Sequence, residues 1–119
     1  MSEAASGALP VDPAWGAAVV AGGLVLRPRF EAGAAGMEAR RVRVHRTLLD
    51  LSARRRPGRL VVRVAKRFGP DLGVDLAWGG PESVDSVLLD DHPLEAQSVR
   101  FVASADHEAQ FLLAEGSGP

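Results

Sequence analysis

Four arginines flank a proline–glycine pair in the segment RRRPGR and form the densest group of ion-pairing side chains in the chain: Arg54, Arg55, Arg56 and Arg59. A guanidinium presents its N–H donors in a fixed fork that matches two oxygens of a carboxylate or a phosphate. Pro57-Gly58 is a typical turn pair, so we expect the group at the tip of a β-hairpin. The hairpin strands carry four more arginines: Arg41, Arg43, Arg63 and Arg67. These eight side chains are the predicted partner-binding residues.

A second group gathers carboxylates and an imidazole around one expected turn: Asp85, Asp90, Asp91 and His92. Oxygen ligands on a turn suit Ca²⁺ or Mg²⁺, and two adjacent carboxylates raise the pKa of one of them. The alternative is a solvated turn, in which an Asp side chain bonds the local backbone and Pro93 fixes the exit. We favour the turn, and we predict no metal site and no cofactor.

The other patterns of catalysis are missing from the sequence. None of the eight serines lies in a nucleophile-elbow pattern, and the three histidines have no ligand-like spacing. We expect His45 to face outward among arginines rather than to act as a base. The glycine pairs match neither a phosphate loop nor a dinucleotide-binding loop. A triad can assemble in space without any order in sequence, but we predict that the protein is not an enzyme.

Hydrophobic alternation predicts a mainly β (α+β) domain. We expect an antiparallel sheet, or a partly closed barrel, of five to six strands with a C-terminal helix packed on it. Strands are predicted within residues 24–30, 38–52, 59–68, 72–78, 84–89 and 98–103. In the second of these, the apolar phase slips near Arg46-Thr47, which indicates a β-bulge. Residues 107–115 contain good helix formers before Gly116 and predict the helix.

Three segments carry a family resemblance: RRVRV (Arg40–Val44), LVVRV (Leu60–Val64), and a strand-to-helix unit that starts at Val99. Their order resembles that in a group of uncharacterised small β-rich proteins of GC-rich bacteria. The resemblance covers about residues 24–114. That group has no assigned activity, so the resemblance implies a fold only.

The length of 119 residues fits one domain. We expect a flexible lead-in over residues 1–13, a single β-rich domain over 14–115 and a disordered tail over 116–119. The apolar run 14–26 is 13 residues long and contains two adjacent glycines, whereas a spanning helix needs about 20 apolar residues. The N-terminus lacks the basic start of a signal peptide. These features, with the absence of cysteine, predict a cytoplasmic protein with no membrane partner.

Charge is segregated along the chain. Residues 27–67 hold 13 of the 14 basic residues and three of the 15 acidic residues, a net charge of +10, and the remainder carries −11. The sequence also lacks Ile, Asn, Tyr and Cys and has 13 Arg to one Lys, as a GC-rich genome would produce. Each arginine is therefore weaker evidence of phosphate binding than it would be in a chain of average composition.

Several interpretations fit this segregation. The acidic half can neutralise the basic hairpin through cross-strand pairs, the hairpin can dock an acidic protein partner or another copy of the chain, or it can hold nucleic-acid phosphates. The last is disfavoured because no aromatic residue is interleaved with the arginines and the pI is about 6.3. Exposed Val25 and Val102 would instead mark a self-association surface. A small-ligand pocket would be lined by the large aromatics: Trp15, Phe68, Trp78 and Phe101. We predict a non-catalytic interaction module that binds an acidic protein or a second copy.

Overall fold

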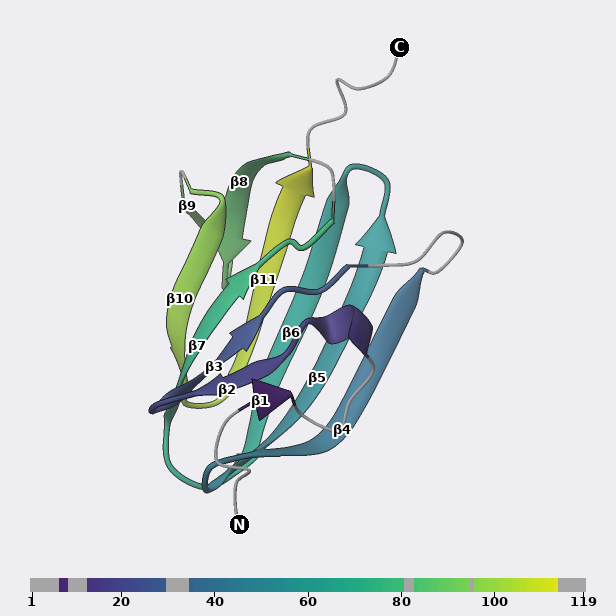
Figure 1. Cartoon of the computed structure of the whole chain (residues 1–119). Coiled ribbons are helices and arrows are strands. Elements are labelled where there is room, and N and C mark those ends of the chain that lie inside the picture. The colour runs from purple at the N-terminus through teal and green to yellow at the C-terminus, as the bar shows by residue number, and fades with distance from the viewer. Residues whose placement is uncertain (1–6, 9–12, 30–34, 81–82, 95, 114–119) are drawn as a thin grey trace.

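Two β-sheets packed face to face make up the part of the chain that the structure, a computed structural model, describes: residues 7–8, 13–29, 35–80, 83–94 and 96–113 (Figure 1). Sheet A has five strands in the order β1 (Gly7–Ala8), β2 (Ala18–Val20), β3 (Gly23–Leu26), β7 (Leu72–Ala77) and β10 (Ser98–Ala103). Sheet B has six strands in the order β4 (Gly36–Val44), β5 (Thr47–Arg56), β6 (Arg59–Phe68), β11 (Asp106–Leu113), β8 (Val84–Leu89) and β9 (His92–Leu94). A 3-10 turn, η1 (Pro13–Trp15), precedes β2, and β3 pairs with β7 in parallel.

The hydrophobic core lies between the two sheets because the long strands alternate buried and outward-facing residues. In β6, for example, the apolar residues at Leu60, Val62 and Val64 are buried, whereas Arg63 and Arg67 on the other face are exposed. Trp15 is fully buried at one end of this core, and its backbone carbonyl accepts a hydrogen bond from Arg27 N at 3.0 Å. Each sheet therefore has an inner face in the core and an outer face toward solvent.

The mainly β class is confirmed, and so is the hairpin in which β5 and β6 flank Pro57-Gly58, where Gly58 has a φ of 74°. β2 and β3 form a further hairpin around Ala21-Gly22. The predicted single sheet or partly closed barrel is wrong, because the strands divide between two sheets. β7 belongs to sheet A and does not continue the β4–β5–β6 meander.

The predicted C-terminal helix is wrong: residues 106–113 form strand β11 between β6 and β8. His107, Ala109, Phe111 and Leu113 alternate toward the core, which is a period of two and not of 3.6. Pairing on both sides and burial of Phe111 outweigh the helix propensity of the intervening residues.

The phase slip near Arg46-Thr47 has a different cause from the predicted bulge. His45 and Arg46 form a two-residue turn between β4 and β5, with Val44 opposite Thr47. His45 has a φ of 56°, and its Nε2 donates a hydrogen bond to the carbonyl of Val20 at 2.8 Å. His45 is thus a turn residue rather than a strand residue. The bulge of this hairpin lies earlier, between Ala39 and Val42.

Parts of three predictions lie outside the described residues. They are most of the lead-in over residues 1–13, Phe30 of the first predicted strand, and the tail over 116–119. No helix within the described ranges has the length and apolar character needed to cross a membrane.

Candidate functional site

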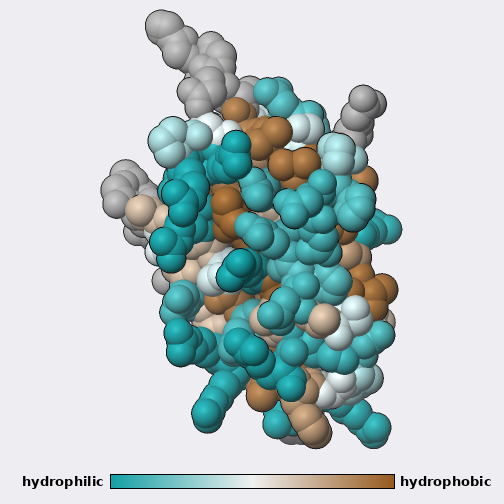
Figure 2. Space-filling view, turned by 180° about the vertical axis from the view of Figure 1, so that it is seen from behind, coloured by the Kyte–Doolittle hydropathy of each residue, from teal (hydrophilic) through white to brown (hydrophobic). Residues whose placement is uncertain are grey.

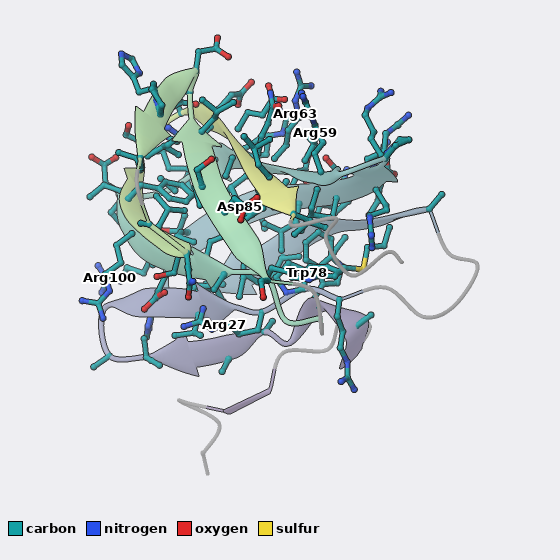
Figure 3. All side chains as sticks on the ribbon, turned by 90° about the horizontal axis from the view of Figure 1, so that it is seen from above. Arg27, Arg59, Arg63, Trp78, Asp85 and Arg100 are labelled. Atoms are coloured by element: carbon teal, nitrogen blue, oxygen red, sulfur yellow. The ribbon has the colours of Figure 1, made fainter. Side chains whose placement is uncertain are left out.

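The outer face of sheet B gathers most of the predicted arginines. In β5, Leu51 and Ala53 point into the core, so Arg54 and Arg56 project from the other side. The exposed arginines of this face come from three strands: Arg40 and Arg43 of β4, Arg54 and Arg56 of β5, and Arg59, Arg63 and Arg67 of β6. Figure 3 shows Arg59 and Arg63 pointing away from sheet A. Hydrophilic residues cover most of this side of the molecule (Figure 2).

One half of this face is neutralised by carboxylates within the chain. Asp50 Oδ2 accepts a hydrogen bond from Arg67 Nε at 2.7 Å, and Asp50 Oδ1 accepts one from the backbone N–H of Arg41 at 2.8 Å. These two bonds lower the pKa of Asp50 below its usual value. Further along β6, Arg63 forms an ion pair of 3.9 Å with Glu108 of β11. The acidic C-terminal segment therefore balances part of the basic hairpin.

The hairpin end is not neutralised in this way, and we call Arg54, Arg56 and Arg59 the arginine tip. Arg56 stands directly opposite Arg59 across the β5–β6 pair. Arg59 donates a hydrogen bond to the neutral Oε1 of Gln110 at 2.8 Å. Arg54 and Arg56 form no ion pair with any residue that the structure describes. The tip therefore has unbalanced positive charge. Directly opposed like charges also destabilise a strand pair.

Two shallow hollows flank the tip. One, of about 460 Å³, is bordered by all three tip arginines and continues toward Glu108 and Gln110. The other, of about 650 Å³, lies between Arg54 and the start of β4. Gly36 is the register partner of Arg54, so no side chain covers the guanidinium from that side. The tip guanidiniums are therefore open to the solvent on this side.

Two of the eight predicted arginines lie elsewhere. Arg55 is half-buried on the inner side of β5, with its guanidinium carbon 5.7 Å from the ring centroid of Trp78, a cation–π distance. Arg41 occupies the β4 bulge with a φ of 56°, and its backbone N–H holds Asp50. The structure thus separates a tip of three arginines from the predicted set of eight.

Two residues of the predicted acidic cluster, Asp90 and Asp91, form a turn. Asp90 and Asp91 connect β8 to β9 with positive φ values of 48° and 70°, which short polar residues tolerate. Asp85 lies near the start of β8, away from this turn, and His92 is exposed. Within the described ranges, no three His, Cys, Asp or Glu residues are placed to hold a metal ion.

An arrangement that sequence reasoning missed joins Asp90 to His107 and Ser104. His107 Nδ1 lies 2.8 Å from Asp90 Oδ2 and donates to it, because a carboxylate only accepts. His107 Nε2 accepts a hydrogen bond from the backbone N–H of Ser104 at 3.3 Å. Burial opposes ionisation of Asp90, but the bonds from His107 and from the Glu108 amide outweigh it and lower the pKa of Asp90.

Asp90, His107 and Ser104 are connected in the same order as the residues of a serine-hydrolase triad. The backbone amide of Ser104, and not its hydroxyl, is the closer partner of His107. Ser104 Oγ lies 3.5 Å from His107 Nε2, and the nearer Ser104 amide occupies the same lone pair. Ser104 borders none of the hollows described in this structure. The group ties the β8–β9 turn to the connection between β10 and β11. The spacing Ser104-x-x-His107 was the only sequence signal, and it gives no clue to the distant Asp90.

The comparisons with known proteins give no family for this chain. No protein-family model matches it, and no curated protein or solved structure gives a significant match. A functional proposal therefore depends on the geometry of the surfaces described above.

Proposed function

We propose that this domain is a non-catalytic interaction module whose arginine tip binds a short acidic segment of a protein partner. The observation that carries the proposal is the direct opposition of Arg56 and Arg59 beside Arg54, with no carboxylate of the described residues on any of the three. Like-charged neighbours on one strand pair destabilise the fold, and an acidic ligand would remove that repulsion.

The composition of the face favours a protein carboxylate ligand over nucleic acid. Glu38 and Glu108 project from the same outer face, one on each side of the β5–β6 hairpin, and both border the hollow at the tip. They would repel a phosphate backbone that continued across the sheet. The three tip arginines also have no aromatic side chain among the residues lining their hollow, so bases would have no stacking surface. A short acidic segment that contacts only the three guanidiniums needs no stacking surface, and it runs past these two carboxylates over a shorter length than a phosphate backbone would.

The test is fluorescence anisotropy with a fluorescein-labelled peptide of six glutamates, and a peptide of six glutamines as the neutral probe. The triple variant R54S/R56S/R59S removes the tip. The matched control R29S/R43S/R46S removes three exposed arginines that form no ion pair within the described residues, so both variants change the net charge equally. We expect the tip variant to weaken glutamate-peptide binding about 3- to 100-fold, as three exposed ion pairs allow, and the control to change it little.

Each result has a definite meaning. Equal weakening by both triple variants would show that net charge, and not the tip, attracts the peptide, and the proposal would be wrong. Tighter binding of a generic single-stranded DNA than of the glutamate peptide at equal salt would replace the acidic-protein proposal with nucleic-acid binding. Absence of binding to either probe at about 50 mM salt, where screening is weak, would reject the tip as an anion-binding surface.

A further inference from the structure

The edge strands of the two sheets differ in their protection against strand pairing. An unprotected edge presents unpaired N–H and C=O groups to any other strand. β4 carries the bulge between Ala39 and Val42, β9 is three residues long and contains Pro93, and β1 has only two residues. Bulges, proline and shortness are the devices by which proteins block edge pairing. These three edges are therefore poor templates for another strand.

β10 has none of these devices. Its six residues, Ser98–Ala103, pair with β7 in unbroken register and include no proline. No residue of β10 forms a hydrogen bond to a strand other than β7 among those the structure describes. In Figure 1, β10 lies at the left margin of the front sheet, on the opposite side of the molecule from β4. Among the described edge strands, it is the one that a bulge, a proline or shortness does not protect.

We infer that β10 pairs antiparallel with β10 of a second copy around a two-fold axis, which joins the two A sheets into one continuous sheet. This inference does not depend on the proposed function of the arginine tip. A C₂ contact requires that the same strand be complementary to itself. The residues of β10 determine whether it is.

The two faces of β10 restrict the register. Val99, Phe101 and Ala103 point inward, and Arg100 and Val102 point outward. Residues directly opposite one another share a face, so a symmetric pair is centred on one residue and not between two. Centring on Arg100 would place two guanidinium groups opposite each other. Asp75 cannot relieve that repulsion, because its carboxylate is already shared by Arg100 Nε and Arg27 Nη2, each at 3.2 Å.

Centring on Phe101 removes the conflict. Phe101 then faces Phe101 of the partner subunit, and Val99 faces Ala103 of the partner subunit, so the inward face is apolar throughout. On the outer face, Arg100 stands opposite Val102 of the partner subunit. Phe101 is half-buried and Val102 is 54% exposed in the single chain, so both have surface left to cover. The strand is therefore self-complementary in this register.

The surface beside Val102 supports the same occupant. A shallow, mainly apolar hollow of about 510 Å³ crosses the outer face of sheet A and ends at β10. It exists because Gly23 and Gly73 are register partners without side chains, and Val20 and Val102 border it. A second β10 continues this apolar surface past the sheet edge. A six-residue strand pair is smaller than the roughly 1,200 Å² of a stable interface, so we expect a transient dimer.

The test places a negative or a positive charge at Val102, which is exposed. In the proposed dimer each Val102 faces Arg100 of the partner subunit, so each substitution changes two cross-strand pairs. V102E should tighten dimerisation and V102K should weaken it, each by about 2- to 30-fold for two cross-strand pairs. F68K adds the same charge at an exposed apolar residue of β6, in sheet B and away from β10, and should leave the equilibrium unchanged. Sedimentation equilibrium over about 10 µM to 1 mM, the range of a transient interface, measures the constants.

Disulfide cross-linking tests the register separately, because the chain contains no native cysteine to compete with introduced ones. A mixture of R100C and V102C should form a disulfide-linked heterodimer, because directly opposite residues lie within disulfide reach, whereas neither variant should cross-link with itself. Self-linking of V102C would overturn the register. A wild-type chain that remains monomeric at about 1 mM, or a dimer insensitive to both V102E and V102K, would overturn the inference.

Discussion

Asp50 links two strands to its own at the point where β4 is irregular. Its carboxylate accepts the backbone N–H of Arg41, which the bulge leaves free of the strand ladder, and the Nε of Arg67 on β6. An aspartate therefore satisfies a backbone donor that the neighbouring strand cannot reach. These two bonds lower the pKa of Asp50 below its usual value, and the bond from the Arg41 amide has the larger effect.

This pKa shift predicts how stability depends on pH. A carboxyl group with a depressed pKa in the folded state contributes stability above its unfolded pKa, and the contribution is lost as pH falls through the folded value. We expect D50N to be less stable than wild type at pH 7, and to lose less free energy of unfolding between about pH 5 and pH 2. Urea denaturation at several pH values measures both.

D91N is the matched control, because the Asp91 carboxylate accepts no hydrogen bond from the described residues and Asn tolerates its φ of 70°. Its pH profile should follow that of wild type. Parallel profiles for D50N and wild type would show that the Asp50 bonds contribute nothing to the pH dependence.

For individual residues, the hydrophobic alternation of the sequence says more about where the arginines point than a count of charges does. Period two from Leu51 and Ala53 puts Arg55 on the core side of β5, and Arg54 and Arg56 on the outer side. That distinction could be predicted. The pairing of Asp50 with Arg67 could not, because it depends on which residues the β5–β6 register brings side by side.

Among the elements, β11 shows how a local pattern can fit two periods. Ala105, Ala109 and Leu112–Leu113 recur at helical spacing, whereas Ala109, Phe111 and Leu113 alternate at strand spacing. The segment itself contains no β-breaker and no decisive helix signal. The choice is made by tertiary context, since β6 and β8 supply hydrogen-bonding partners on both sides.

The two periods make opposite predictions for neighbouring residues of β11. In the strand, Phe111 is fully buried and Leu112 lies half-buried on the outer face. We therefore expect F111A to lower the free energy of unfolding by about 3–5 kcal/mol, and L112A by at most about 1 kcal/mol. A helix packed through Leu112 and Leu113 would reverse this order. Chemical denaturation measures both, and F111L provides a milder change if F111A does not fold.

The turn at His45 and Arg46 illustrates a second limit at the element scale. A hairpin turn of two residues and a one-residue bulge both shift the apolar phase of a strand pattern. Neither His45 nor Arg46 is a typical turn residue, so the phase shift could be predicted from the sequence but its cause could not. In contrast, Pro57-Gly58 is a typical turn pair, and that hairpin was predicted from the sequence.

For the whole molecule, the division into two sheets was the feature least accessible from sequence. β3 and β7 pair in parallel although about 46 residues separate them, and such non-local pairing leaves no local pattern. Charge segregation, however, could be read from the sequence. The structure places the acidic β11 beside the basic β6, so part of the +10 is balanced internally and the excess remains at the arginine tip.

The two proposed surfaces lie on different sheets, since the tip belongs to sheet B and β10 to sheet A. Dimerisation through β10 would therefore leave both tips open and create a bivalent binder. On a surface densely coated with the six-glutamate peptide, we expect wild type to be retained at least about tenfold longer than V102K, because rebinding by the second tip is intramolecular. Binding of one free peptide in solution should be the same for both proteins.

The added positive charge of V102K would by itself lengthen retention on an acidic surface, so shorter retention identifies the loss of the dimer. F68K carries the same charge without touching β10 and should be retained at least as long as wild type. If V102K and F68K dissociate from the coated surface at the same rate, the two tips do not act together. If both also match wild type in sedimentation, the β10 contact itself is absent, and the tip acts as a single site.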